Sequence, residues 1–274
     1  MGRPAFRVDG ATGITCSRCL ELHEPALLEA RLMVCPSCGC HLRLGARDRL
    51  ALLADDGSFL EWDAGLAAAD PLRFSDRKAY PERVEEARCG TGERDAVVTG
   101  AGRLRHRPLA LAAFEFGFMG GSMGAVVGER LSRLFDRARA HGMPAVVVTA
   151  SGGARMQEGL QALMQMAKVT AAIERFREAR LPYVSVLADP TTGGVAASVA
   201  ALGDFVVAEP GAQIGFAGPR VIEQTIGAPL AADFQRAERL LERGLVDAVV
   251  PRAELRDWVD GVLAATVPSG RARS

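Results

Sequence analysis

Apolar runs alternate with glycine-rich turns and longer amphipathic stretches over most of the chain. The β-branched run at 144–150 and the apolar run at 183–187 are typical of buried parallel strands. Each passes through glycines into a stretch that could form a helix, and the first of these helices should extend to about Glu178. Short runs of β-forming residues at 96–99, 103–105 and 109–116 predict further strands of the same sheet. The pattern therefore predicts an α/β fold built from repeated strand, turn and helix units.

Smaller elements are expected outside this repeat. The sequence predicts a short helix at 46–55, a polar surface excursion at 70–81, a strand at 213–216 and a short helix at 221–226. An amphipathic helix at 231–242, a last strand at 246–250 and a last helix at 254–264 complete the chain. Their apolar stripes indicate packing or an interface between proteins.

Two cysteine pairs lie near the N-terminus, with fifteen residues between the pairs. This spacing is typical of four thiolates that bind one zinc ion from two short knuckles. A redox-active pair is the minor alternative. Because four thiolates fill the coordination sphere, we expect a structural zinc, and the stretch at 23–34 should form the hairpin of a zinc ribbon. The expected ligands are Cys16, Cys19, Cys35 and Cys38.

Composition and charge narrow the function classes. The 33 basic residues balance the 33 acidic residues, so no overall field attracts nucleic acid or an anionic membrane. The first 50 residues contain seven arginines and five acids, and this weak basic patch keeps a zinc-ribbon nucleic-acid-binding regulator as a rival function. No apolar stretch approaches the roughly 20 residues that span a bilayer. We expect a soluble, cytoplasmic protein without a membrane partner.

Two glycine corners are the main candidates for chemistry. Gly193 and Gly194 follow the strand at 183–187 and open a helix, and Gly152 and Gly153 follow the strand at 144–150. Backbone N–H groups at such corners are unshielded, and a helix start favours negative charge. If the two strands are neighbours, one N–H from each corner could bind a single oxygen that becomes an enolate. A simple packing turn is the alternative interpretation.

Other catalytic interpretations have weaker support. Ser151 lacks the glycine two residues earlier that a nucleophile elbow requires, since Thr149 stands there, so a helix cap is the better interpretation. The glycines at 117–128 do not give the dinucleotide-binding spacing. Arg155 and Glu158 could steer an anionic substrate or form an ion pair along a helix.

Five long motifs resemble the carboxyltransferase β subunits of bacterial-type acetyl-CoA carboxylase. The motifs occupy 118–129, 151–159, 163–168, 189–195 and 214–222, and the resemblance extends from Cys16 to about Ala265. It implies a crotonase-like (ClpP/crotonase) core of stacked ββα units with a small N-terminal zinc ribbon. The expected division is a tail at 1–15, the ribbon at 16–45, a linking helix and excursion at 46–95, and the carboxyltransferase domain at 96–274.

The resemblance also implies a reaction. The family transfers the carboxyl group from biotin, carried on biotin carboxyl carrier protein and charged by biotin carboxylase, to acetyl-CoA, and so forms malonyl-CoA for fatty acid synthesis. By resemblance, Gly193 and Gly194, with an N–H from Gly152 or Gly153, form an oxyanion hole for the thioester enolate. The freed biotin can take the α-proton, so no protein base is required. Candidate substrate-binding residues are Arg155, Phe216 and Arg220.

Partners and rival functions follow from the same comparison. The second oxyanion hole belongs to the α subunit in this family, so we expect an α2β2 assembly and a chain that is inactive alone. Some departures from the family pattern permit a paralogue that carboxylates another acyl-CoA. A hydratase or hydrolase that acts alone on CoA thioesters would need an acid or base near the glycines, and none is evident. The departures are Glu115, Gly117, Ala125, Arg130 and Ala188.

Overall fold

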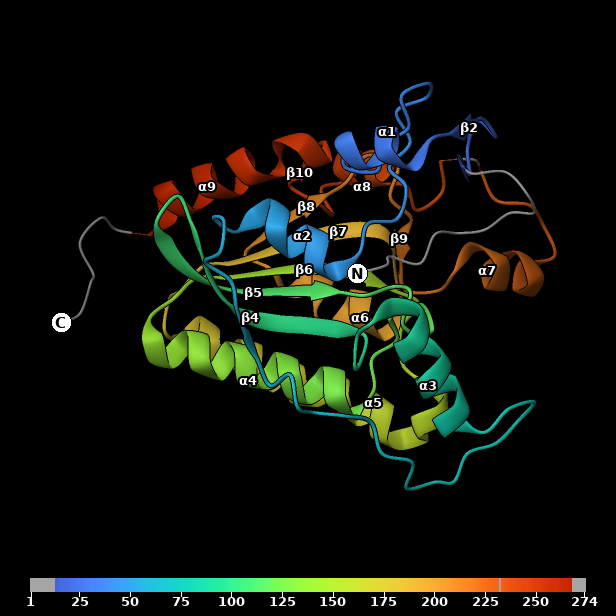
Figure 1. Ribbon diagram of the computed structural model, residues 1–274, viewed down its shortest axis with the longest axis horizontal. Helices are drawn as coiled ribbons and strands as arrows, with labels where there is room; N and C mark the ends of the chain where they lie inside the picture. Colours follow the sequence, from blue (N-terminus) through green and yellow to red (C-terminus); the bar gives the residue numbers. More distant parts are fainter. Residues whose placement is uncertain (1–12, 232, 268–274) are drawn as a thin grey trace.

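A mixed β-sheet forms the centre of the protein. The computed structural model describes residues 13–231 and 233–267. Most of the expected tail (1–12) and the last residues of the expected core domain (268–274) therefore lie outside the described residues. Within the described chain the sheet has eight strands in the order β10-β8-β7-β6-β5-β4-β3, with β9 beside β7 (Figure 1). The strands are β3 (Leu60–Trp62), β4 (Val97–Leu104), β5 (Arg107–Phe114), β6 (Ala145–Ser151), β7 (Tyr183–Thr192), β8 (Phe205–Ala208), β9 (Ile214–Gly215) and β10 (Ala248–Val249).

Strand direction divides the sheet into two parts. Strands β3, β4 and β5 are antiparallel, and β4 joins the two short runs that the sequence analysis treated as separate strands. From β5 through β6, β7 and β8 to β10 the pairing is parallel. All seven residues of β6 are buried, as its β-branched sequence predicts.

Helices cover both faces of the sheet (Figure 1). Helices α4 (Ala125–His141) and α5 (Gly159–Glu178) lie on one face, and α2 (Ala46–Leu53) and α9 (Leu255–Thr266) lie on the other. The ring of Phe135 in α4 packs edge-on against Phe176 of α5, with centroids 5.4 Å apart. The other helices of the core are α3 (Tyr80–Thr91), α6 (Gly193–Ser198), α7 (Pro219–Ile226) and α8 (Ala237–Glu242), with short 3-10 turns at Met119–Gly121, Met156–Glu158, Ala200–Leu202 and Arg252–Glu254.

Most predicted elements are present, and several boundaries differ. Helix α4 ends at His141, because Gly142 adopts a left-handed conformation with φ of 63° and caps the helix. The amphipathic stretch at 231–242 is helical only from Ala237, and the expected last strand shortens to β10. Among the described helices, none is both long enough and apolar enough to cross a bilayer.

The cysteine-bearing segment forms a small separate cluster above the sheet (Figure 1). Its hairpin is made by β1 (Ile14–Thr15) and β2 (Leu22–His23), which are antiparallel. The expectation of a hairpin at 23–34 is wrong, because half of that stretch forms helix α1 (Pro25–Ala30). Proline favours the first turn of a helix, where its missing N–H costs nothing, and Leu28 anchors the helix in the cluster.

A buried carboxylate ties this cluster to the sheet. Glu209 directly follows β8 and accepts hydrogen bonds from Arg49 (Nη1, 2.9 Å) and Arg252 (Nε, 2.7 Å). Arg252 also donates to the carbonyl oxygens of Leu32 (2.6 Å) and Leu42 (3.0 Å) in the cysteine segment. Burial opposes ionisation of Glu209, but Arg49 and Arg252 hold its pKa well below the usual range. The cysteine segment is therefore fixed near the end of β8.

Candidate functional site

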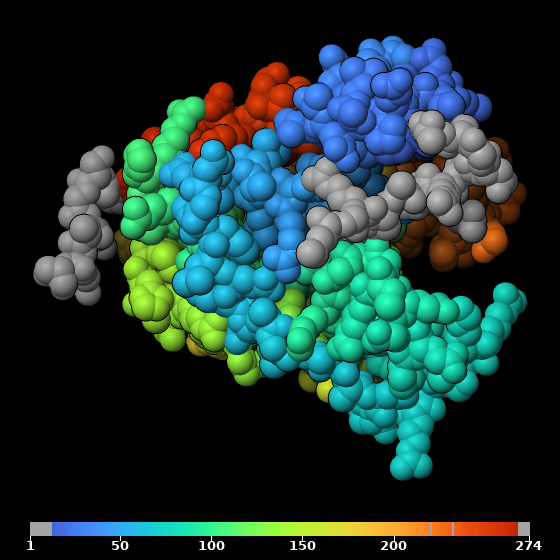
Figure 2. Space-filling view, viewed as in Figure 1, coloured from blue at the N-terminus to red at the C-terminus, as the bar shows by residue number. Residues whose placement is uncertain are grey.

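The parallel strands β5, β6 and β7 end at one edge of the sheet, on the right in Figure 1. Loops that leave the carboxyl ends of parallel strands are the usual place for a binding site in α/β folds. Here they are the loop at 115–124, the corner at 152–158 and the corner that begins helix α6. The cysteine segment, the 70–91 region and α7 project at the same end of the molecule (Figure 2).

The two predicted glycine corners are in direct contact. A Cβ atom on Gly153 would lie 3.2 Å from Cα of Gly193 and 3.4 Å from the backbone nitrogen of Gly194. A Cβ on Gly193 would lie only 2.9 Å from Cα of Gly153, and its φ of +63° also favours glycine. The corners therefore pack backbone against backbone, as the neighbouring strands predicted, and side chains at Gly153 or Gly193 would push them apart.

Three of the four expected N–H donors already have acceptors within the chain. Each forms a short hydrogen bond that holds the corner in shape, so in this conformation it does not point freely at a ligand. The acceptors are the carbonyl of Gly120 for Gly152 (2.8 Å), Oγ of Ser151 for Gly153 (3.0 Å) and the carbonyl of Phe216 for Gly193 (2.9 Å). Ser151 therefore caps a turn and not a helix.

Gly194 is the remaining donor. It lies in the first turn of α6, where backbone N–H groups have no partner in the helix. Within residues 13–231 and 233–267 its N–H has no hydrogen-bond acceptor. A Cβ on Gly194 would lie 2.4 Å from Sδ of Met166 in α5, so the position is closely packed. Sequence reasoning missed Met166, whose position inside a helical stretch gave no signal beyond packing.

The side chain of Arg155 is buried behind the β6 corner. Its guanidinium forms a two-pronged ion pair with Asp95, at 2.7 Å and 3.1 Å, and both side chains have no exposed surface. It also lies 3.3 Å from Glu158, which is the ion pair considered from the sequence. Burial lowers the pKa of Arg155, but the charge of Asp95 and its hydrogen bonds outweigh burial and raise the pKa above its usual value. Asp95 lies just before β4 and gave no local signal.

An open groove borders the corner that follows β6. It has a volume of about 620 Å³ and is lined partly by Phe116, Met119, Gly120, Ser122 and Gly152. The groove contains apolar surface beside backbone polar groups, which suits a ligand with both kinds of group.

The other two substrate-binding candidates follow β9, one before α7 and one in its first turn. The side chain of Phe216 is 71% exposed, while its carbonyl holds the Gly193 N–H. Arg220 lies in the first turn of α7, but its side chain lies outside what the structure describes. Exposed apolar side chains continue along this end of the molecule. They are Met156, Leu160, Leu163 and Met164 at the start of α5, and Val221 and Ile226 of α7.

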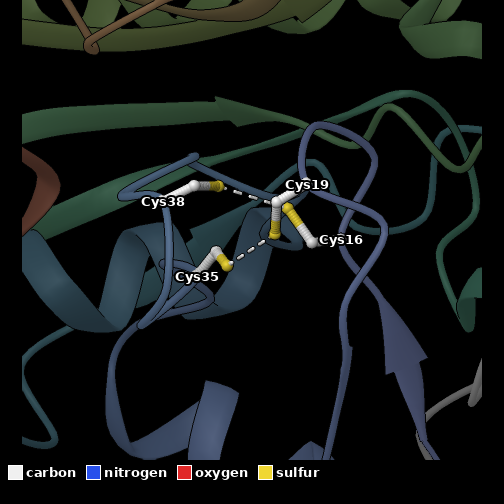
Figure 3. A group of neighbouring side chains, drawn as sticks. All are labelled: Cys16, Cys19, Cys35 and Cys38. Atoms are coloured by element: carbon white, nitrogen blue, oxygen red, sulfur yellow. Dashed lines mark hydrogen bonds between the residues drawn. The ribbon is translucent and has the colours of Figure 1, made fainter.

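Four cysteines converge in the N-terminal segment and could hold a metal ion (Figure 3). Their sulfur atoms all lie within 4.8 Å of one another, with Cys16 and Cys38 at 3.6 Å and Cys19 and Cys35 at 3.7 Å. Zinc–sulfur bonds of about 2.3 Å in a tetrahedron place sulfur atoms about 3.8 Å apart. The arrangement therefore fits one tetrahedral ion.

The pKa values of the neighbouring thiols depend on one another, and this dependence favours metal binding. Burial disfavours the Cys16 thiolate, but the backbone N–H groups of Cys19 and Arg18 outweigh burial and lower the pKa of Cys16 to about 6. The Glu21 backbone favours the Cys19 thiolate, but burial and the neighbouring thiols raise the pKa of Cys19 to about 12. Without a cation, one thiolate suppresses ionisation of the next, and a bound metal ion removes this conflict.

Curated relatives resemble almost the whole chain. The acetyl-coenzyme A carboxylase carboxyl transferase subunit beta of Citrifermentans bemidjiense is 49% identical over 262 residues, which cover 95% of this chain and 93% of that protein. The subunit of the same name from Sorangium cellulosum is 52% identical over 258 residues, which cover 94% of this chain and 90% of that protein.

Solved structures show the same fold. The transcarboxylase 12S core matches with a TM-score of 0.68 at 27% identity and covers 81% of this chain and 41% of its own. A Pseudomonas malonate decarboxylase hetero-dimer matches with a TM-score of 0.65 at 30% identity, and covers 82% and 88%. These neighbours are crotonase-fold proteins, which confirms the predicted fold class. Residues 43–249 match the family described as carboxyl transferase domain, and the chain belongs to this family.

Proposed function

We propose that this chain is the β-type carboxyltransferase subunit of an acetyl-CoA carboxylase. With an α-type partner it transfers a carboxyl group from carboxybiotin to acetyl-CoA and forms malonyl-CoA. The observation that carries the proposal is the contact of two glycine corners beside an unpaired N–H of Gly194, in a chain about half identical to subunits of that name. We expect the reaction to take place in the cytoplasm.

The role of the chain is to stabilise the enolate of the thioester. The N–H of Gly194, at the positive start of α6, donates to the thioester oxygen as that oxygen gains charge. The N–H groups of Gly152, Gly153 and Gly193 hold the two corners in shape through their own hydrogen bonds. Because these residues have no side chains, the substrate can approach the protein backbone closely. Biotin on the carrier protein supplies the carboxyl group and, once free of it, a base for the α-proton. Phe216 lies on the exposed side of the corner and is proposed to contact the substrate.

The four-cysteine site is proposed to hold a structural zinc ion. Cys16, Cys19, Cys35 and Cys38 would bind it as thiolates and leave no open position for a substrate. The segment that they fold buries only a small apolar cluster, so a metal ion is needed to keep it compact.

An α-type subunit is the proposed partner. The starts of α5 and α7 expose large apolar side chains at the same end of the chain as the corners, where a partner could complete the site. The malonate decarboxylase relatives were solved as a hetero-dimer and a hetero-tetramer. The proposal therefore includes an α2β2 assembly and transient contact with the biotin carboxyl carrier protein, which biotin carboxylase charges.

The test is a reconstituted assay. The chain is co-expressed with the α-type carboxyltransferase subunit of the same organism, and the purified complex receives carboxylated carrier protein and acetyl-CoA. Malonyl-CoA should form with the complex and not with either subunit alone. A parallel reaction with propionyl-CoA shows whether the complex is a paralogue that prefers another acyl-CoA to acetyl-CoA.

A matched pair of variants links the activity to the corner. Gly193→Ala places a Cβ against Gly153, whereas a Cβ at Gly218, before α7, meets nothing within 4 Å. Activity should be lost in Gly193→Ala and retained in Gly218→Ala. A well-folded complex that makes no malonyl-CoA would refute the proposed function.

A further inference from the structure

We propose that Arg155 is a positioning residue for the oxyanion corner and does not bind substrate. The inference rests on the proposed function and assigns to Arg155 a role different from the substrate contact expected from the sequence.

Every nitrogen of the guanidinium is already used inside the protein. Nη2 donates to Asp95 (2.7 Å) and to the carbonyl of Ser122 (2.8 Å), and Nε donates to Oγ of Ser122 (3.2 Å). Nη1 donates to Asp95 (3.1 Å), to the hydroxyl of Tyr80 (3.1 Å) and to Glu158 (3.3 Å). The side chain has no exposed surface, so an anionic substrate would have to displace carboxylates that are already in place.

The same side chain joins the loop after β5 to the corner after β6. Ser122, held by the guanidinium, precedes Met123, whose N–H donates to the carbonyl of Gly153 (2.8 Å). Met123 in turn accepts from the N–H of Arg155 (2.9 Å), and Gly152 donates to Gly120 (2.8 Å). Backbone hydrogen bonds therefore join the two loops into one layer. The guanidinium of Arg155 stabilises this layer through its hydrogen bonds to Ser122.

This layer is the surface against which the second corner rests. Gly153 is the residue that meets Gly193 and the nitrogen of Gly194. A Cβ on Gly121, in the loop that Arg155 holds, would lie 2.0 Å from the carbonyl oxygen of Ala150, so the loop has almost no room to shift independently. Because Gly153 contacts this second corner, a displacement of the layer would also move the Gly194 N–H that donates to the thioester oxygen.

Charge balance explains why an arginine is required. Arg155 lies between two carboxylates, Asp95 and Glu158, and the buried Arg130 also interacts electrostatically with Asp95. Glu158 also accepts a hydrogen bond from the N–H of Ala125 (2.6 Å) at the start of α4, where the helix end is positive. A lysine would preserve the net charge, but it could not span Asp95 and Ser122 with a planar fork.

The test compares two buried arginines in the complete α/β complex. Arg155→Lys keeps the charge and loses the fork. Arg130→Lys is the matched control, because Arg130 is also buried, its hydrogen bonds go to carbonyls such as that of Val97 (2.5 Å), and lysine keeps the charge that Arg130 presents to Asp95. Arg155→Lys should lower kcat for malonyl-CoA formation by about 10- to 100-fold, since small misplacements of an oxyanion donor are costly. The KM for acetyl-CoA should stay within about twofold, because substrate contacts are unchanged.

A second measurement separates this inference from the proposed function. Hydrogen exchange of the 119–124 and 151–158 backbone should become faster in Arg155→Lys and remain unchanged there in Arg130→Lys. Asp95→Asn, which keeps the shape of the acceptor and removes its charge, should give the same two effects in milder form. A higher KM with unchanged kcat would overturn the inference in favour of substrate binding, and unchanged exchange at both loops would also overturn it. An inactive wild-type complex would refute the proposed function, and the exchange result would still decide the role of Arg155.

Discussion

Substitution of Glu209 by glutamine should destabilise the protein strongly, although the site lies outside the proposed oxyanion hole. Glu209 is 1% exposed and accepts four hydrogen bonds, two from Arg49 and two from Arg252. Glutamine has nearly the same shape and can accept through its amide oxygen. It removes the carboxylate that Arg49 and Arg252 share, and the described residues offer these two buried cations no other ion-pair partner.

The structure sets the size of the effect. Removal of one partner from a buried ion pair typically costs about 3 to 5 kcal/mol of unfolding free energy. Arg252 would retain the carbonyls of Leu32 and Leu42, and Arg49 would retain that of Leu44 at 3.2 Å, so we expect the lower end, about 3 kcal/mol. At about 2 to 4 °C per kcal/mol, the melting temperature should fall by roughly 6 to 12 °C.

Thermal and urea unfolding, followed by circular dichroism, provide the measurement. Asp136→Asn is the matched control, since the Asp136–Arg175 pair is 42% and 44% exposed and should contribute less than about 1 kcal/mol. Addition of Arg252→Met to the Glu209→Gln variant should restore part of the lost stability, because it removes one uncompensated charge. A loss no larger than that of the control would show that the buried cluster does not hold the cysteine segment on the sheet.

Other predictions concern pH, the corner and the metal site. The pKa of Glu209 is depressed in the folded state, so its stabilisation is complete above its unfolded pKa of about 4.3 and disappears as pH falls through the folded value. The difference in unfolding free energy between wild type and Glu209→Gln should therefore narrow below about pH 4, and a constant difference would contradict the assigned pKa. Gly193→Ala should lower kcat at least about 100-fold, and Gly218→Ala should leave it unchanged in the same assay. Elemental analysis should find one zinc per chain, lost in Cys38→Ser and retained in Cys89→Ser, whose cysteine is exposed and outside the cluster. Retention of full zinc by Cys38→Ser would exclude the proposed ligand set.

The sequence was most informative where local chemistry determines structure. The spacing of the cysteine pairs predicted their convergence, because short knuckles leave few other ways to satisfy four thiols. The repeated strand and glycine pattern predicted that the two corners are neighbours, because successive parallel strands pair through short connections.

The features that local pattern could not reveal depend on distant residues. Arg155 had the spacing of a surface pair with Glu158, and only the fold brings Asp95 beside it, 60 positions earlier in the chain. The donor set of the corner was uncertain for the same reason, since the acceptor of the Gly193 N–H is Phe216 on a later strand connection. Periodicity identifies elements, whereas the partners of buried polar groups are set by tertiary packing.

The contacts of Arg252 also determine the order in which the protein can be assembled. Its acceptors Leu32 and Leu42 precede it by 220 and 210 residues. During synthesis the cysteine segment is made at least 210 residues before the arginine that anchors it, so it can fold around the proposed metal ion first. The contact of this segment with Arg252 can therefore form only after all strands of the described sheet have been synthesised.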